Sequence, residues 1–262
     1  MGGEQNQIGY ARMKRLLVTG ATSGIGEAVA LLAAKNGYVV IACGRNKDKL
    51  AILEQQPNIS TCQFDVTDLQ ATKTALAEVE CDIVLLNAGT CEYVDVDAID
   101  AAMFQRVFDA NVFGVVNVIE ALSPKLVAGN KLVFVDSLAR LLPFARSQAY
   151  GASKAALHYM AKSFAVDFAA KGIQVQTISP GFVKTPLTDK NDFPMPMSIE
   201  VEEAAQDILN GLASRQASVY FPTRFSLLLR CLDALPEFIQ HKLCLSMRQA
   251  PAAQVEQQKR DS

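Results

Sequence analysis

Short runs of apolar residues alternate along the chain with longer stretches in which apolar and polar residues mix at helical spacing. The apolar runs predict strands at 15–20, 38–43, 61–64, 82–87, 131–136, 173–178 and 218–221. The mixed stretches predict helices near 24–35, 46–54, 69–79, 100–123, 149–171 and 200–213. Most of the strand candidates are apolar at nearly every position, which is typical of strands that are covered on both faces.

This alternation of strand and helix predicts an α/β fold. We expect a doubly wound Rossmann-type fold with a mainly parallel seven-stranded sheet flanked by helices. Ligands bind beyond the carboxyl ends of the strands in such sheets, so unusual residues at those ends are the first site candidates. The expected domain is 13–222, followed by a C-terminal helical extension at 223–250, with a disordered N-terminal extension at 1–12 and a flexible tail at 251–262.

The first predicted strand runs into the sequence TGATSGIG at residues 19–26. Gly20, Gly24 and Gly26 lie where a buried strand turns into a helix, and glycine lets the backbone turn tightly and approach a ligand. A helix N-terminus in turn favours a phosphate. We expect this turn, with Thr22, Ser23 and Ile25, to bind a dinucleotide, although its spacing is G-x-x-x-G-x-G rather than G-x-G-x-x-G. A glycine-rich turn without a ligand is the alternative.

The second predicted strand ends at Gly44 and Arg45. Dinucleotide-binding folds often have an acidic residue here, which binds the ribose hydroxyls of NAD. A carboxylate would repel a 2′-phosphate, whereas an arginine pairs with it. Arg45 therefore favours NADP(H) over NAD(H), and a solvated surface arginine is the alternative.

The third and fourth predicted strands also end in candidate cofactor residues. Asp65 and Val66 are expected to flank an adenine ring, while Asp68 is a candidate cap for the next helix. Asn87, Ala88 and Gly89 form a turn of small residues where the backbone is expected to pass close to the cofactor.

Ser137 follows the fifth predicted strand, and Tyr150 and Lys154 lie four residues apart in SQAYGASKAAL, residues 147–157. Residues four apart share one face of a helix, with Cβ atoms about 5–6 Å apart. A neighbouring ammonium lowers the pKa of a phenol from its usual value near 10, so the pair is a candidate for coupled chemistry. A surface helix that carries both residue types is the alternative.

Taken together, these motifs resemble the short-chain dehydrogenase/reductase family, in its compact single-domain branch. The resemblance covers residues 13 to about 222 and rests on TGATSGIG, NAG (87–89), Asn111, Ser137, the Tyr150 and Lys154 pair, and SPGFVKT (179–185). It implies that Tyr150 is the general acid and base, that Ser137 polarises the substrate oxygen, that Lys154 also binds the nicotinamide ribose, and that Asn111 continues a proton relay through water. It further implies that Pro180, Gly181, Val183 and Thr185 lie at the nicotinamide, and that residues 186–200 close over the substrate. Related proteins are often dimers, so a homodimer or homotetramer is expected.

Two segments depart from the family pattern. Asp136 stands where many relatives have the first of two adjacent serines. Residues 225–248 predict two short apolar helices separated by Pro236, which would act as a lid, a partner surface or an in-plane membrane anchor, the first two being favoured. His158 is interpreted as an interface or packing residue rather than a catalyst.

Composition narrows the function further. The net charge of −2 provides no basic field for nucleic acid. Six cysteines without a CxxC pair, together with only two histidines, argue against a metal site and suit reduced thiols in the cytoplasm. No apolar run reaches about 18 residues, which predicts no transmembrane helix, and the polar first twelve residues lack the apolar region of a signal peptide.

The expected function is therefore an NADP(H)-dependent oxidoreductase that transfers a hydride between nicotinamide and a lipophilic carbonyl or secondary alcohol. The alternative from another class is a non-catalytic dinucleotide-binding sensor on the same fold. A sugar-nucleotide epimerase is disfavoured by the short chain and the glycine spacing.

Overall fold

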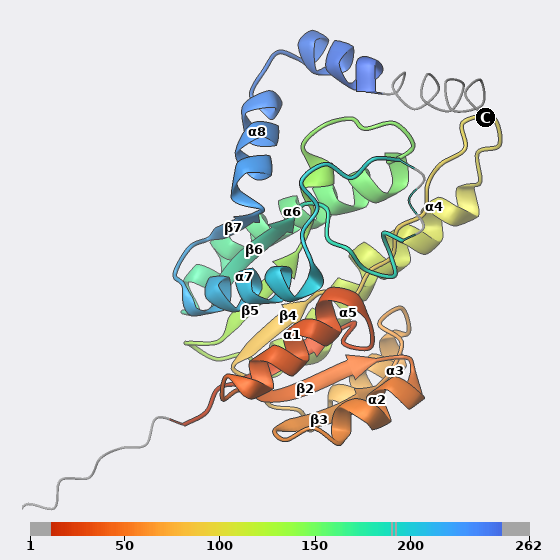
Figure 1. The fold of residues 1–262 in the computed structure, drawn as a ribbon. Helices are drawn as coiled ribbons and strands as arrows, with labels where there is room; N and C mark the ends of the chain where they lie inside the picture. Colours follow the sequence, from red (N-terminus) through yellow and green to blue (C-terminus); the bar gives the residue numbers. More distant parts are fainter. Residues whose placement is uncertain (1–11, 190, 192, 248–262) are drawn as a thin grey trace, which may run out of the picture.

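The fold is taken from a computed structural model, which describes residues 12–189, 191 and 193–247. Its strands are β1 (Arg15–Thr19), β2 (Val39–Gly44), β3 (Ile59–Gln63), β4 (Ile83–Leu86), β5 (Lys131–Val135), β6 (Gln174–Pro180) and β7 (Ser218–Phe221). They form one seven-stranded sheet in the order β3-β2-β1-β4-β5-β6-β7, and every neighbouring pair is parallel (Figure 1). The predicted doubly wound α/β fold is confirmed.

The helices connect these strands and cover both faces of the sheet. They are α1 (Gly24–Lys35), α2 (Lys47–Glu54), α3 (Leu69–Leu76), α4 (Ala101–Phe108), α5 (Gly114–Leu122), α6 (Gln148–Ala169), α7 (Val201–Ala213) and α8 (Thr223–Asp233), with shorter turns η1 (Asp109–Phe113), η2 (Ser123–Lys125) and η3 (Leu138–Arg140). Helices α1 and α7 pack on one face, and α3, α5 and α6 contribute to the core on the other.

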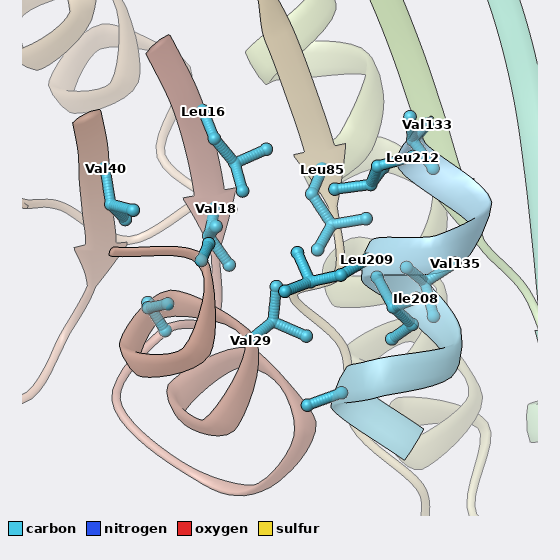
Figure 2. Packing of buried hydrophobic residues seen from close by; sticks show 14 of the residues in the cluster. Leu16, Val18, Val29, Val40, Leu85, Val133, Val135, Ile208, Leu209 and Leu212 are labelled. Carbon is cyan, nitrogen blue, oxygen red and sulfur yellow. The ribbon is translucent and has the colours of Figure 1, made fainter. Parts of the chain in front are cut away.

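Neighbouring residues of one strand serve opposite faces of the sheet. Leu16 and Val18 of β1 pack with Val29 of α1 and Leu209 of α7, as Figure 2 shows, whereas Leu17 belongs to the opposite core. All three β1 side chains are fully buried. This two-sided burial explains why the strands are continuous apolar runs, since neither face meets water.

The helical run Ala101–Lys125 joins α4, η1, α5 and η2 without a break. It is the one helix within the described residues that is long and apolar enough to cross a membrane, whereas the sequence predicted none. Length and composition alone are weak evidence for a membrane span, because a helix in the core of a folded domain meets the same criteria. Val115, Val118, Ile119 and Leu122 of this run are buried in the core against the sheet.

The element boundaries differ from the prediction mainly at β3 and in the long helix. Strand β3 begins at Ile59, two residues before the predicted 61, because Asn58 turns the chain with a φ of 62°. The predicted helix at 100–123 contains a π-helical turn, η1, which no apolar periodicity indicates.

The C-terminal segment forms two helices, as predicted: α8 and a second helical stretch at 237–247. Phe225 and Leu229 of α8 and Cys244 of the second stretch pack in one buried cluster with residues that follow β5, among them Leu138 and Leu142. These helices therefore contact the loop between β5 and α6. Residues 1–11 of the expected N-terminal extension and the whole of the expected tail, 251–262, lie outside the described residues.

Candidate active site

A cleft of about 660 Å³ lies at the carboxyl ends of the strands. It gathers nearly all of the residues that the sequence singled out: Gly20, Thr22, Ser23, Gly24, Ile25, Arg45, Asp65, Val66, Asn87, Ala88, Gly89, Ser137, Tyr150, Lys154, Pro180, Gly181, Val183 and Thr185. Two predicted residues, Gly26 and Asn111, do not line the cleft and lie behind it. The chain thus brings residues from six strand ends to one place.

The glycine turn after β1 is packed too closely for side chains. Gly20 and Gly24 have φ values of +69° and +53°, which L side chains rarely adopt. A Cβ on Gly26 would lie 2.3 Å from the carbonyl oxygen of Gly20 and 2.6 Å from Nδ2 of Asn87. Helix α1 begins after Ser23, whose side chain does not cap it. This tight turn with an uncapped helix start suits the close approach of a phosphate group.

Thr19, at the end of β1, joins this turn to the next strand end. Its Oγ1 accepts hydrogen bonds from the backbone N–H groups of Asn87 and Ala88, both at 3.0 Å. Nδ2 of Asn87 donates a hydrogen bond to the carbonyl oxygen of Thr19, also at 3.0 Å. The sequence analysis missed Thr19, although its place at a strand end was a usable signal.

Arg45 pairs with Asp65 across the ends of β2 and β3. Its Nη1 lies 3.2 Å from Oδ2 of Asp65, and 76% of its side chain is exposed. Burial raises the pKa of Asp65, but hydrogen bonds from Thr67 and the pairing with Arg45 outweigh it and leave this pKa below its usual value. Asp68 caps α3 by accepting from the N–H of Ala71 at 2.9 Å, as predicted.

Ser137, Tyr150 and Lys154 meet beyond the end of β5. Ser137 begins η3 and accepts a hydrogen bond from the N–H of Ala139 at 3.1 Å. Tyr150 and Lys154 lie one turn apart on α6, and the ammonium of Lys154 donates to the carbonyl oxygen of Val135 at 2.9 Å. The predicted proximity of the three side chains is therefore present.

Burial dominates the titration of this group. It raises the pKa of Tyr150 well above its usual value, with Cys91 and Asp136 adding to the rise and a hydrogen bond with Ser137 opposing it. It also lowers the pKa of Lys154 to about 8, against the opposing charges of Asp136 and Cys91. The pKa of Tyr150 is thus raised overall, whereas the sequence analysis expected a lowered value. The ammonium of Lys154 lies over the phenol ring, 5.8 Å from its centroid, and burial of the phenol is the dominant effect on its pKa.

Asn111 lies in the π turn η1 and is fully buried. Its Oδ1 accepts from the N–H of Thr90 at 2.7 Å, and its Nδ2 donates to the carbonyl oxygen of Thr90 and to Oγ of Ser153, both at 2.9 Å. A Cβ on Gly89 would lie 2.8 Å from Oδ1 of Asn111 and 3.5 Å from Nζ of Lys154. Asn111 therefore holds the turn after β4 beside Lys154, and its part in a proton relay stays a prediction.

Aromatic side chains from separate segments meet beside the cleft. Tyr93, in the loop after β4, donates a hydrogen bond from its hydroxyl to Oδ1 of Asn191 at 2.6 Å and meets Phe193 edge to face at a centroid distance of 5.4 Å. Phe182 lies 6.2 Å from Phe193 and 5.7 Å from Phe225 of α8. The segment after β6 is thus held between the loop after β4 and the C-terminal extension.

Asp136 carries an ion-pair cluster that the sequence analysis missed. Its side chain is fully buried, and Oδ2 lies 3.1 Å from Nε of Arg140 and 2.6 Å from Nδ1 of His158. The interpretation of His158 as an interface or packing residue omitted this polar contact. The usable signal was its spacing, since His158 lies a further four residues along α6 from Lys154.

The chain is similar in sequence to a family of known proteins. The family model described as short chain dehydrogenase matches residues 14–194. An uncharacterized oxidoreductase from Myxococcus xanthus is 33% identical over 84% of this chain and 92% of its own length. A 3beta-hydroxysteroid dehydrogenase from Mediterraneibacter gnavus is 35% identical, over 68% of this chain and 69% of its own. An NADPH-dependent 1-acyldihydroxyacetone phosphate reductase from Saccharomyces cerevisiae is 34% identical, over 69% of this chain and 65% of its own.

Solved structures agree with the fold. A short-chain dehydrogenase from Sphingobium yanoikuyae, in complex with NADPH, superposes with a TM-score of 0.75 at 25% identity, over 91% of this chain and 98% of its own. A short chain dehydrogenase/reductase from Burkholderia phymatum, in complex with NAD, gives a TM-score of 0.74 over 83% of this chain and 92% of its own. At 20% identity, the second structure bears on the fold alone.

Proposed function

The chain belongs to the short-chain dehydrogenase/reductase family, and we propose that it is an NADP(H)-dependent enzyme that reduces a lipophilic carbonyl compound or oxidises the corresponding alcohol. The observation that carries this proposal is the convergence of Ser137, Tyr150 and Lys154 in the same cleft as the glycine turn. Fold alone would leave the reaction open, because one fold hosts many functions.

The residues of the cleft fit a dinucleotide. The closely packed turn at Gly20 and Gly24 suits a pyrophosphate at the start of α1. The exposed guanidinium of Arg45 suits a 2′-phosphate. Asp65 contacts only Nη1 of this guanidinium, and the other nitrogens carry further N–H donors. The NADPH dependence in the name of the yeast relative supports the same preference.

The catalytic side chains suit proton transfer to a carbonyl oxygen. When bound, the nicotinamide supplies or accepts the hydride. Tyr150, whose raised pKa keeps it protonated at neutral pH, would donate the proton in the reductive direction. Ser137 would hydrogen-bond the substrate oxygen, and Lys154 would bind the ribose hydroxyls through its ammonium.

The proposal of a lipophilic substrate rests on the aromatic side chains in and around the segment after β6. Phe193 contacts both Tyr93 and Phe182, and it lies within residues 186–200, which are expected to close over the substrate. Two relatives support it, because their names specify a hydroxysteroid and an acylated dihydroxyacetone phosphate.

We also propose that the protein forms a homodimer or homotetramer in the cytoplasm. Phe113 of η1 and Tyr159 and Val166 of α6 leave large apolar side chains 57–75% exposed, which suits contact with a second copy. Light scattering of the full chain tests the oligomer, and a monomer at micromolar concentration would contradict it.

The decisive experiment is a fluorescence titration of the full chain with NADPH and with NADH, for the wild type and for Arg45→Asp. We expect a preference for NADPH that Arg45→Asp removes, because the new carboxylate repels the 2′-phosphate. Lys47→Asp is the matched control, since it makes the same charge change in α2, outside the cleft. A preference for NADH would contradict the cofactor assignment.

Catalysis is then tested by NADPH oxidation with a panel of aliphatic, steroid and acylated ketones. Turnover that is lost in Tyr150→Phe supports the proposal. Tight NADPH binding with no turnover of any panel member, and no difference between wild type and Tyr150→Phe, would favour the non-catalytic sensor.

A further inference from the structure

Asp136 lies between β5 and the candidate catalytic Ser137, and it is a carboxylate with no access to water. The residue is 2% exposed, and it borders the cleft together with Tyr150 and Lys154. A buried carboxylate is costly unless charges or hydrogen bonds compensate it. The question is therefore what holds this charge there and what the charge does.

Arg140 and His158 hold the carboxylate of Asp136. Both contact the same oxygen, Oδ2, at 3.1 Å and 2.6 Å, and neither lines the cleft. Nδ1 of His158 must carry the hydrogen of this contact, because an ionised carboxylate can only accept. Their side chains are 11% and 12% exposed, so the cluster is shielded from solvent. Asp136 is therefore fixed in place by Arg140 and His158.

The other oxygen of this carboxylate is uncompensated. Oδ1 is buried and has no hydrogen-bond partner among the described residues. The ammonium of Lys154 donates to the carbonyl oxygen of Val135, the residue directly before Asp136, and Asp136 and Lys154 both line the cleft. The charges that act on Lys154 come from Asp136 and from Cys91, in the loop after β4. Tyr150 is affected by the same two groups and by its hydrogen bond with Ser137. Asp136 is the carboxylate of this group, and Cys91 is a thiol.

We propose that Asp136, fixed by Arg140 and His158, is the buried counter-charge of Lys154 and thereby a positioning residue for the reaction at Tyr150. This inference rests on the proposed function, because Lys154 and Tyr150 matter together only at that site. It assigns a role to the position where the family pattern has an uncharged serine.

The physical argument concerns the charge state of Lys154. An ammonium buried beside carbonyl oxygens and a phenol loses its solvation and tends to release its proton. The pKa of Lys154 has fallen to about 8 in spite of Asp136, which opposes the fall. Without the carboxylate it would fall further, and a neutral amine would then face the cofactor at neutral pH. Asp136 therefore keeps the lysine charged where the reaction needs it.

Two substitutions should move this titration in opposite directions. Asp136→Asn removes the negative charge with little change in shape, so the titration midpoint of Lys154 is expected to fall by about one pH unit. Arg140→Gln keeps the carboxylate but removes one of its compensating charges, so the midpoint is expected to rise. A change in packing alone would not reverse sign between the two variants.

The midpoint is measured by NMR of the full chain that carries ¹³C at Cε of lysine, with Lys154→Met identifying the signal. No substrate is needed, so the result is separable from the proposed function. A midpoint that stays at the wild-type pH in Asp136→Asn overturns the inference even in an active enzyme. A shifted midpoint in a protein that reduces no compound supports the counter-charge and contradicts the proposed function instead.

The kinetic counterpart is the pH profile of kcat/KM for NADPH oxidation. The alkaline limb is expected to move to lower pH in Asp136→Asn and to return toward the wild type in Asp136→Glu, which restores the charge. If Asp136→Asn does not fold, Arg140→Gln decides the matter by the direction of its shift. A midpoint that is unchanged or lower in Arg140→Gln overturns the inference.

Discussion

The ammonium of Lys154 lies 5.8 Å from the ring centroid of Tyr150 and donates its hydrogen bond to the backbone of β5, at Val135. The two side chains share one face of α6, one helical turn apart. Burial is the largest effect on both titrations, raising the pKa of Tyr150 and lowering that of Lys154. A protonated Tyr150 suits the donation of a proton, which is the reductive direction of the proposed reaction.

Replacement of Tyr150 by phenylalanine removes the proposed proton donor and little else. We expect kcat to fall by about 10²–10⁴-fold, while NADPH affinity stays within twofold to threefold of the wild type, as a rough bound. Tyr159→Phe is the matched control, because Tyr159 lies on the same helix outside the cleft and the substitution keeps its aromatic ring, so kcat and NADPH affinity should stay unchanged. Steady-state kinetics and NADPH titration together check this, and unaltered turnover in Tyr150→Phe would exclude the tyrosine as the acid.

The affinity for NADPH should depend on pH through Lys154. Its pKa of about 8 means that the ammonium is present below that pH and lost above it. Because the charged form is the better donor to ribose hydroxyls, affinity is expected to weaken as the pH rises through about 8. Fluorescence titrations on both sides of this pH check the effect. Lys154→Met should bind NADPH weakly with a flat profile in this range, and an equally steep profile in that variant would assign the effect to another group.

Gly26 should tolerate no side chain. A Cβ there would lie 2.3 Å from a backbone oxygen, so we expect Gly26→Ala to lower the free energy of unfolding by about 1–3 kcal/mol and to weaken NADPH binding. Gly37→Ala is the control, since Gly37 has a φ of +83° but nothing within 4 Å of its added Cβ. It should cost only about 1 kcal/mol of backbone strain and leave binding intact. Urea unfolding with NADPH titration separates the two, and equal losses of binding would disprove the close-packing argument.

Phe193 should affect the substrate rather than the cofactor. Its ring contacts Tyr93 and Phe182, so Phe193→Ala removes apolar surface beside the proposed substrate position. We expect KM for a lipophilic ketone to rise by about tenfold, equivalent to ~1.4 kcal/mol, with NADPH affinity unchanged. Met197→Ala, in the same segment but 52% exposed, is the control. A larger loss of NADPH affinity than of substrate affinity would show that this segment serves the cofactor.

Much of the fold was predictable from sequence because its signals are local. Strand β1 reads as apolar at consecutive positions because Leu16 and Leu17 face different, equally buried cores. Asp68 was recognisable as a helix cap, since capping depends on residues within one turn. The partial failures were also local in origin: the left-handed turn at Asn58 and the π turn at Asn111 leave no periodic pattern.

Part of the candidate site was also predictable from sequence, and part of it was not. The spacing of Tyr150 and Lys154, and the position of Ser137 after an apolar run, are visible in the sequence because strand ends and helix faces follow from the pattern, and the family resemblance implied their catalytic roles. The sequence could not show that Asp136 contacts both Arg140 and His158, nor that Asn111 forms a hydrogen bond with the backbone of Thr90. Arg140 is only four residues from Asp136, but His158 is 22 residues from Asp136 and Asn111 is 21 residues from Thr90, so these contacts depend on how separate segments pack. The sequence by itself determined which chemical groups are present and which strand ends carry them, whereas only the tertiary structure decided how far each group is removed from water and therefore which proton it holds.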